Sequence, residues 1–460
     1  MIFLLFLLFS PLISADLPCN GNLNLNPSSD ISKPYYFPPT WRPVQPVPMY
    51  ATMQSCQFTL VIPQGMYAEV NIRKRGAKSI ITCTYPNGVV ENVTDLDSGL
   101  YIFTSTKAVI TLNANGWNGY FAFELVWKKF EGYILNNALL GPNRDPFLFK
   151  ATEYLTVFET NLGSRVSLVA FNLNNNTLLR QSVILDGNSL NAPFIGTLAQ
   201  VLNSGKQLLS SSNTLTIYTF DLQYKTNNLY LYCGNDYRDT AHFVSYTGHN
   251  CKTPTDCSFS IDAQSGPSAV ITTYYAPEYI KNLTIDGGSS LSVYQNGVRK
   301  SDFITSFVHA DNSLPAELKY TVHQYTLESG SANVVLSRNA TDAKWRVPYD
   351  GRTGIIESFF YGKPSYSQDT NEYLAMPDKS QKMYFTFSIV QADFDKLGLV
   401  SLYLGVLNDN QLTYSKTYSI KNPVPVGNTT VHGDTFKVIY TTSGQPTKGF
   451  QVSFKTTKNI

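Results

Sequence analysis

The sequence is poor in charge. Charged residues make up 15% of its 460 residues, against about 25% in ordinary soluble domains. Lysine and arginine together number 35 and aspartate and glutamate 33, so the formal net charge is only +2. Nucleic acids and anionic membranes attract proteins that carry a large excess of positive charge. We therefore expect no nucleic-acid partner and no direct electrostatic binding to a membrane.

The sequence also lacks the motifs of common enzymes. Its five histidines form no HExxH zinc motif, and no GxSxG elbow, GxGxxG loop or P-loop is present. The densest titratable group is Asp236-Tyr-Arg-Asp239 with His242, which could act on a glycoside as paired carboxylates but is better explained by surface salt bridges. The most compact basic cluster, Arg73-Lys74-Arg75 with Lys78, fits the solvated end of a strand. We expect no catalytic residue, no cofactor and no metal.

Sustained helical periodicity is absent as well, and apolar residues alternate with period two. Phe121, Phe123, Leu125 and Trp127 share one face of such a run. Similar runs recur at residues 57–62, 68–72, 215–224, 228–232, 269–275, 318–326, 382–390, 399–407 and 436–441. Short strands at this density, separated by Asn, Gly and Ser clusters, predict an all-β chain of tandem β-sandwich units with less than about 10% helix.

Only the N-terminus carries a pronounced hydrophobic run. Residues 1–15, MIFLLFLLFSPLISA, contain no charged side chain and end on small residues, which predicts a cleaved signal peptide. No later run approaches the roughly 20 apolar residues that span a bilayer, and the polar tail 455–460 does not suit a GPI signal. We expect a secreted, extracellular protein without a transmembrane anchor, which reaches a membrane surface only through partners.

The cysteines and glycosylation motifs agree with secretion. The cysteines are Cys19, Cys56, Cys83, Cys233, Cys251 and Cys257, and an even number in a secreted chain favours disulfides over metal binding. Cys56 opens one predicted strand and Cys83 ends another, so we expect a Cys56–Cys83 disulfide. The partner of Cys257 stays open, with Cys233 and Cys251 nearest. Five Asn-X-Ser/Thr motifs predict N-glycosylation at Asn92, Asn175, Asn282, Asn339 and Asn428.

An internal repeat is visible. Cys56-Gln-Phe58 resembles Cys257-Ser-Phe259, and Tyr85-Pro-Asn-Gly-Val89 resembles Tyr294-Gln-Asn-Gly-Val298. Asn-Gly suits a type I′ turn, so the repeat predicts a tight hairpin at the same place in both copies. We divide the chain after the signal peptide into four β-units, at residues 16–130, 131–250, 251–340 and 341–460.

The first unit has the features of a known family. Four stretches together resemble the nematode CUB-like domain family: Tyr36–Pro43, Ser55–Phe58, Pro63–Ala68 and Phe121–Trp127. The resemblance covers residues 33–130 well and residues 251–340 loosely. It implies tandem CUB-like, jelly-roll-like sandwiches and a link with intestinal defence against microbes, although the family carries little mechanism. The Pro-rich stretch at residues 33–50 is expected to form an extended arm on the first sandwich.

Calcium-binding CUB domains hold the ion with acidic residues from neighbouring loops. Glu91, Asp95 and Asp97 are the nearest acidic cluster in this sequence, and a solvated loop explains them better than a calcium site.

We therefore expect a non-catalytic recognition protein of innate immune defence that binds microbial or host-surface glycans, in the intestinal lumen or at the apical membrane surface. Repeated units let several weak sites act together, and 30 tyrosines offer rigid amphipathic contact area where they are exposed. The alternatives are a structural component of an extracellular surface layer and a hydrolase whose site is assembled from distant residues.

Overall fold

The computed structural model shows an all-β chain. It describes residues 21–50, 53–75, 80–94, 99–114, 119–130, 135–142, 144–150, 155–220, 230–252, 256–273, 277–308 and 312–459. The helical segments within these ranges are short: η1 (Asn176–Gln181), α1 (Leu198–Ser204), α2 (Tyr237–Thr240) and η2 (Lys300–Asp302). The predicted all-β fold class is confirmed. The predicted signal peptide lies outside the described residues.

The first unit packs two five-stranded sheets against each other. One sheet has the order β1 (Gly21–Leu25), β4 (Ser55–Val61), β9 (Lys107–Asn113), β6 (Ile80–Thr84), β7 (Val90–Asn92). The other has the order β2 (Tyr35–Phe37), β10 (Gly119–Lys129), β5 (Met66–Arg75), β8 (Gly99–Thr104), and β3 (Met49–Tyr50) also pairs with β10. Strand β1 runs parallel to β4. The Pro-rich stretch supplies β2 and β3 and buries Phe37 and Trp41, as expected of an arm on this sandwich.

The second unit repeats this strand order. Its sheets run β11 (Leu135–Leu139), β13 (Leu155–Glu159), β18 (Thr214–Thr219), β15 (Ser182–Leu185), β16 (Phe194–Thr197), and β12 (Phe147–Lys150), β19 (Tyr230–Asp236), β14 (Val166–Ala170), β17 (Leu208–Leu209). Strand β11 runs parallel to β13, as β1 does to β4.

The third unit repeats it again. Its sheets run β20 (Ser245–Asn250), β22 (Ser268–Thr273), β27 (Val322–Leu327), β24 (Ser290–Gln295), β25 (Phe303–Val308), and β21 (Asp256–Ala263), β28 (Gly330–Ser337), β23 (Glu278–Ile285), β26 (Ala316–Leu318). Strand β20 is the parallel edge strand. It belongs to the third sandwich, so this unit begins before Ser245 and not at the predicted residue 251.

The fourth unit keeps the order without a parallel strand. Its sheets run β29 (Thr353–Glu357), β36 (Phe450–Thr457), β31 (Met383–Ala392), β34 (Thr429–Gly433), and β30 (Thr370–Ala375), β35 (Thr435–Thr441), β32 (Ser401–Asn408), β33 (Gln411–Tyr418). All strand pairs reported for these two sheets are antiparallel. In the part of the chain that the structure describes, β30 is therefore the edge strand of its sheet. The equivalent strands β4, β13 and β22 each pair with an additional parallel strand.

The structure aligns the sequence repeat differently from the prediction. The two Asn-Gly pairs do lie at equivalent places, after β6 in the first unit and after β24 in the third. The two Cys-X-Phe motifs do not, because Cys56 lies on β4 whereas Cys257 lies on β21. Strand β21 takes the place of β2 in the shared strand order. The predicted match between Cys56 and Cys257 is therefore wrong.

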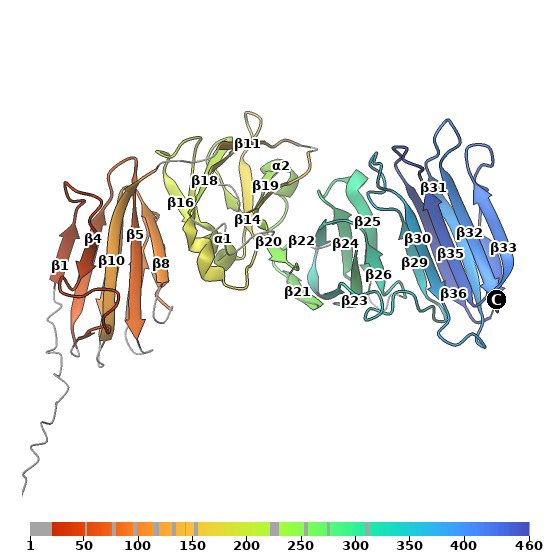
Figure 1. The fold of residues 1–460 in the computed structure, drawn as a ribbon, viewed down its shortest axis with the longest axis horizontal. Coiled ribbons are helices and arrows are strands. Elements are labelled where there is room, and N and C mark those ends of the chain that lie inside the picture. Colours follow the sequence, from red (N-terminus) through yellow and green to blue (C-terminus); the bar gives the residue numbers. More distant parts are fainter. Residues whose placement is uncertain are drawn as a thin grey trace, which may run out of the picture.

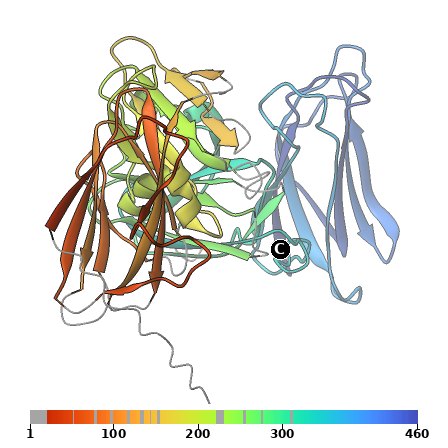
Figure 2. The same ribbon diagram turned by 60° about the vertical axis from the view of Figure 1, so that its left-hand side comes forward.

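The four units lie in a row with their strands crossing the long axis (Figure 1), and a view turned by 60° separates the fourth unit from the others (Figure 2). Apolar contacts join each unit to the next. The Tyr67 and Phe220 rings lie 4.5 Å apart at the first junction, and the Tyr279 and Trp345 rings lie 6.1 Å apart at the third. At the second junction Phe171 forms an isolated β-bridge with Gly248. No helix among the described residues is long and apolar enough to cross a membrane.

Candidate binding cleft between the third and fourth units

The predicted Cys56–Cys83 disulfide is wrong, because Cys83 is a free thiol buried in the first sandwich. Strand β9 lies between the two cysteines and pairs Cys56 with Leu112 and Cys83 with Ile110. Adjacent strands are about 4.8 Å apart. Cysteines two strands apart therefore exceed the Cα separation of about 7 Å that a disulfide can bridge. Cys56 itself is disulfide-bonded.

The other cysteines answer the question that the sequence left open. Cys257 is bonded to Cys251, with their Cα atoms 5.4 Å apart. Cys233 is a free, buried thiol, and burial raises its pKa, so its reactive thiolate form is suppressed. Cys19 lies outside the described residues.

The five glycosylation motifs all present an exposed asparagine: Asn92, Asn175, Asn282, Asn339 and Asn428. Asn175 also caps η1, because its Oδ1 accepts a hydrogen bond of 3.1 Å from the backbone N–H of Thr177. Exposure makes these sites accessible to a glycosyltransferase, and their use stays a prediction.

Glu91 is not part of a solvated acidic loop. It accepts a hydrogen bond of 2.9 Å from the Tyr85 hydroxyl and forms an ion pair with Arg180 of the second unit. The carboxylate is thus engaged in joining two sandwiches. Asp95 and Asp97 lie outside the described residues.

The predicted salt bridges around Asp236 exist, but the carboxylate is buried rather than on the surface. It accepts hydrogen bonds of 2.7 Å from the Arg238 guanidinium and 2.6 Å from the Ser164 hydroxyl. Burial alone would raise its pKa, but these hydrogen bonds outweigh it and hold the pKa well below the usual range. Exposed His242 packs on the Phe243 ring instead. The pKa of Asp239 shifts in the opposite direction, because burial and the negative charge of Asp236 both raise it.

The basic cluster is also tied into the fold. Lys74 is buried and donates a 2.8 Å hydrogen bond to the Val93 carbonyl, so the prediction of a solvated strand end is wrong for it. Lys78 lies outside the described residues.

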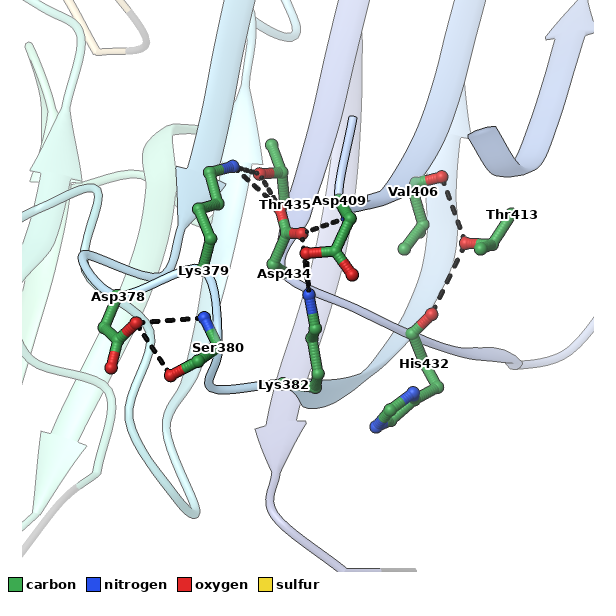
Figure 3. A network of polar contacts seen from close by, with 10 residues as sticks. All are labelled: Asp378, Lys379, Ser380, Lys382, Val406, Asp409, Thr413, His432, Asp434 and Thr435. Carbon is green, nitrogen blue, oxygen red and sulfur yellow. Dashed lines mark hydrogen bonds and ion pairs between the residues drawn. The ribbon is translucent and has the colours of Figure 1, made fainter. Parts of the chain in front are cut away.

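A second buried carboxylate anchors the fourth unit (Figure 3). Asp434 receives Lys379 Nζ at 2.7 Å, Lys382 Nζ at 3.3 Å and the backbone N–H of Asp409 at 2.6 Å. These donors outweigh burial and lower the pKa of Asp434. Because donors from the protein itself surround the carboxylate, the cluster is structural.

The strongest candidate site is a cleft of about 410 Å³ between the third and fourth units. Strands β25 and β26 supply one wall and β29 and β36 the other. Its polar lining consists of five hydroxyl side chains and two carboxylates: Thr305, Ser306, Ser313, Thr353, Ser453, Glu317 and Glu357. The volume lies in the range of small-molecule sites, about 300–1,000 Å³.

The two carboxylates are both buried. Glu317 accepts a 3.2 Å hydrogen bond from the Tyr279 hydroxyl and lies 3.3 Å from Lys319 Nζ. Glu357 accepts a 3.2 Å hydrogen bond from the side-chain amide of Gln451. Burial raises the pKa of each carboxyl to about 7. The cleft therefore contains two acids that change charge near neutral pH.

Arg352 fixes the two walls relative to each other. This buried guanidinium donates to the carbonyls of Trp345 and Val347, both at 2.8 Å, and to the Pro315 carbonyl at 3.0 Å. Pro315 belongs to the third unit, while Trp345 and Val347 lead into the fourth. Burial lowers the pKa of Arg352 to about 10, so it stays charged at neutral pH.

Exposed aromatic side chains gather in the same part of the sequence. Among the described residues, the exposed large aromatic side chains are Phe303, Tyr349, Phe360, Tyr366 and Tyr373. Tyr349 donates to the carbonyl of Leu314, next to Ser313 in the cleft lining. Many other tyrosines fill sandwich cores, as Tyr50, Tyr101 and Tyr325 do. A tyrosine-rich adhesive surface along the whole chain is therefore not what the fold presents.

No sequence motif marks this cleft, because Glu317 and Glu357 lie 40 positions apart on different sandwiches. A weaker signal was available. Glu357 follows Ile355 and Ile356 in a predicted β chain, and an acid that ends an apolar run is a candidate for burial.

Comparison with known proteins bears on the first unit. Residues 14–131 match the family model described as CUB-like domain. This match supports a CUB-like family for the first unit. Two further family models, described as domains of unknown function DUF7592 and DUF7591, match residues 143–220 and 238–339. No curated protein matches the chain.

Several solved structures resemble the chain weakly. The CUB1-EGF-CUB2 domain of human MASP-1/3 is 10% identical, with 41% of this chain and 94% of that chain covered and a TM-score of 0.15. The corresponding rat MASP-1 domains are 6% identical, with 68% and 99% covered and a TM-score of 0.18. The extracellular region of zebrafish Gpr126/Adgrg6 is 9% identical, with 79% and 62% covered and a TM-score of 0.19. TM-scores this low carry no argument about how the units are arranged.

Proposed function

We propose that this chain is a secreted, non-catalytic recognition protein of innate immune defence that binds carbohydrate on microbial or host surfaces. The cleft between the third and fourth units is the observation that carries the proposal. CUB-like domains are binding modules typical of extracellular proteins, and the first unit matches the family model of such a domain.

The lining of the cleft suits a sugar. Hydroxyls such as Thr305 and Thr353 can donate to and accept from sugar hydroxyls, and the carboxylates of Glu317 and Glu357 are strong acceptors when ionised. Exposed aromatic residues such as Tyr349 add an apolar face with a polar tip.

The row of sandwiches supports recognition of a surface rather than of a single molecule. Apolar contacts hold neighbouring units together, so sites on different units would keep a constant spacing. Linked weak sites can gain roughly 10²–10⁴-fold in avidity on a repetitive surface. Innate defence and the identity of the sugar belong to the proposal.

The test is binding of the full chain, purified from secreting cells, to a glycan array and to whole bacteria. Thr305→Trp should fill the cleft and reduce binding at least about tenfold. Val308→Trp is the matched control, because Val308 is an exposed residue of the same strand outside the cleft lining. It should bind like the unmodified chain.

The alternatives predict different results. Folded protein that binds no glycan and no microbe would contradict recognition, and insoluble self-assembly would then favour a surface-layer component. Turnover of a glycoside or ester panel that Thr305→Trp abolishes would favour a hydrolase.

A further inference from the structure

One carboxylate in the cleft, that of Glu357, forms no ion pair with a cation among the residues that the structure describes. Glu357 is only 4% exposed, and its Oε2 accepts the hydrogen bond from Gln451. Its Oε1 is buried without a hydrogen-bond partner among the described residues. Within the same part of the chain, no lysine or arginine forms an ion pair with it.

The neighbouring acids differ from Glu357 in this respect. Lys319 Nζ lies 3.3 Å from Glu317 and 4.0 Å from Glu372. Arg346 lies 3.7 Å from Glu372. The two cations Lys319 and Arg346 thus form ion pairs with the carboxylates of Glu317 and Glu372, and neither forms an ion pair with Glu357 in the described structure. The hydrogen bonds described for Arg352, the other buried cation here, go to backbone carbonyls.

A buried carboxylate without a cation is unfavourable, and so is an acceptor without a donor. A ligand that enters the cleft with a positively charged N–H donor would supply both. An ammonium group does so, whereas a hydroxyl supplies only the hydrogen bond.

We propose that the cleft selects a sugar bearing a free primary amine, with Glu357 receiving the ammonium group and the threonine hydroxyls of the lining receiving the ring hydroxyls. This inference rests on the proposed function and names the class of sugar. The cavity of about 410 Å³ suits a small ligand. Five hydroxyl side chains of the lining can pair with the ring hydroxyls of a sugar, which the stem of a lysine side chain does not have.

The charge of Glu357 should show in the pH dependence of binding. The titratable groups that act on it are Glu317 and Lys319 from the third unit, and Tyr320 and Tyr361 feel its charge in turn. Burial raises the pKa of Glu357 to about 7, so affinity for an amine should rise from about pH 6 to pH 7.5. It should fall again once the ligand amine loses its proton, near pH 8 for an ordinary α-amine.

The experiment is isothermal titration of the full chain with the disaccharide of glucosamine and with its N-acetylated counterpart. The chain should bind the free amine at least about tenfold more tightly. Glu357→Gln keeps the shape of the side chain and should lose this preference. Glu328→Gln makes the same charge change on an exposed turn residue and should keep it. Circular dichroism confirms that both variants are folded.

Equal affinity for the two sugars, or a preference that survives in Glu357→Gln, would overturn the inference. So would a lysine-containing peptide that competes as well as the amino sugar, because the site would then recognise protein. Failure of both disaccharides while the array shows other cleft-dependent glycans overturns this inference alone. Failure of every glycan and microbe overturns the proposed function with it.

Discussion

Arg180 of the second unit forms an ion pair with Glu91 of the first, and its guanidinium lies 4.6 Å from the centroid of the Tyr101 ring. The Arg180 side chain is only 6% exposed, so this contact is shielded from salt and water. Glu91 belongs to the acidic cluster that was the nearest candidate for a calcium site in the sequence, and in the fold its carboxylate is paired with Arg180 instead.

Arg180→Met should weaken the first junction. Removal of the cation leaves Glu91 partly buried with only the Tyr85 hydroxyl as a described donor, and breaking a buried pair costs about 3–5 kcal/mol. Because Glu91 keeps some exposure, we expect a smaller loss of about 2–3 kcal/mol in the free energy of unfolding, measured by urea denaturation. Lys206→Met, at an exposed position of the same unit, should change the free energy of unfolding by less than about 0.5 kcal/mol. Equal effects of the two variants would show that the pair contributes nothing specific.

Arg352→Met should destabilise the third junction. The substitution leaves the carbonyls of Trp345, Val347 and Pro315 without this donor, and a buried acceptor left unsatisfied costs about 1–3 kcal/mol. We expect a loss of at least about 3 kcal/mol by chemical denaturation. Lys396→Met, on an exposed loop of the fourth unit, is the control. A loss below about 1 kcal/mol for Arg352→Met would contradict this role.

The free thiols should not react with alkylating reagents in the folded protein. Cys83 and Cys233 are fully buried, and burial raises the pKa of both, so iodoacetamide should modify neither until denaturant is added. Peptide mapping without reduction should recover Cys251 joined to Cys257. Recovery of a Cys56–Cys83 peptide from native protein would show that the strand order in the first sheet is different.

Stability should fall as pH rises through the acid range. Glu357 has an ordinary pKa of 4.5 and a pKa of about 7 in the fold, so the folded state keeps its proton where the unfolded chain has lost it. Between about pH 4.5 and 7 the free energy of unfolding should decrease by on the order of 2–3 kcal/mol from this group alone. Glu357→Gln should remove that part of the slope in urea denaturation at a series of pH values. An unchanged slope would mean that Glu357 ionises normally.

Secretion from a eukaryotic host should add N-glycans. All five acceptor asparagines are exposed, so treatment with peptide-N-glycosidase should lower the mass and convert each occupied asparagine to aspartate. Asn175 is the least favourable acceptor, because its side chain already accepts hydrogen bonds from the backbone N–H and hydroxyl of Thr177. Mass spectrometry of tryptic peptides would settle each site, and five unmodified peptides would contradict the prediction.

The fold could be predicted from the sequence because it depends on local alternation. The runs at residues 382–390, 399–407 and 436–441 correspond to strands β31, β32 and β35, whose apolar side chains face the core. The two Asn-Gly pairs do mark connections at equivalent places, but the predicted type I′ turns are wrong, because only Gly88 of the first pair and only Asn296 of the second have a positive φ. That all four units share one strand order could not be predicted, because strand pairing joins residues far apart in the chain.

The wrong disulfide and the missed cleft both have a related cause, which is contact between residues far apart in the sequence. Cys56 and Cys83 looked like neighbours because each lies near a strand end, and only the insertion of β9 between their strands separates them. Glu317 and Glu357 looked unremarkable because each is a single acid in an apolar stretch. Their common surroundings arise from the packing of one sandwich on the next, for which the sequence has no motif.

The shared core of the first two sandwiches has a mechanical consequence. Tyr67 and Phe130 pack with Tyr218 and Phe220 in one continuous apolar cluster, so stretching either sandwich strips the surface that the other needs. When force is applied to the two termini, the first two units should therefore not unfold one after the other. They should unfold together in a single event that releases the contour length of both sandwiches, and below that force the end-to-end distance of the pair should stay constant.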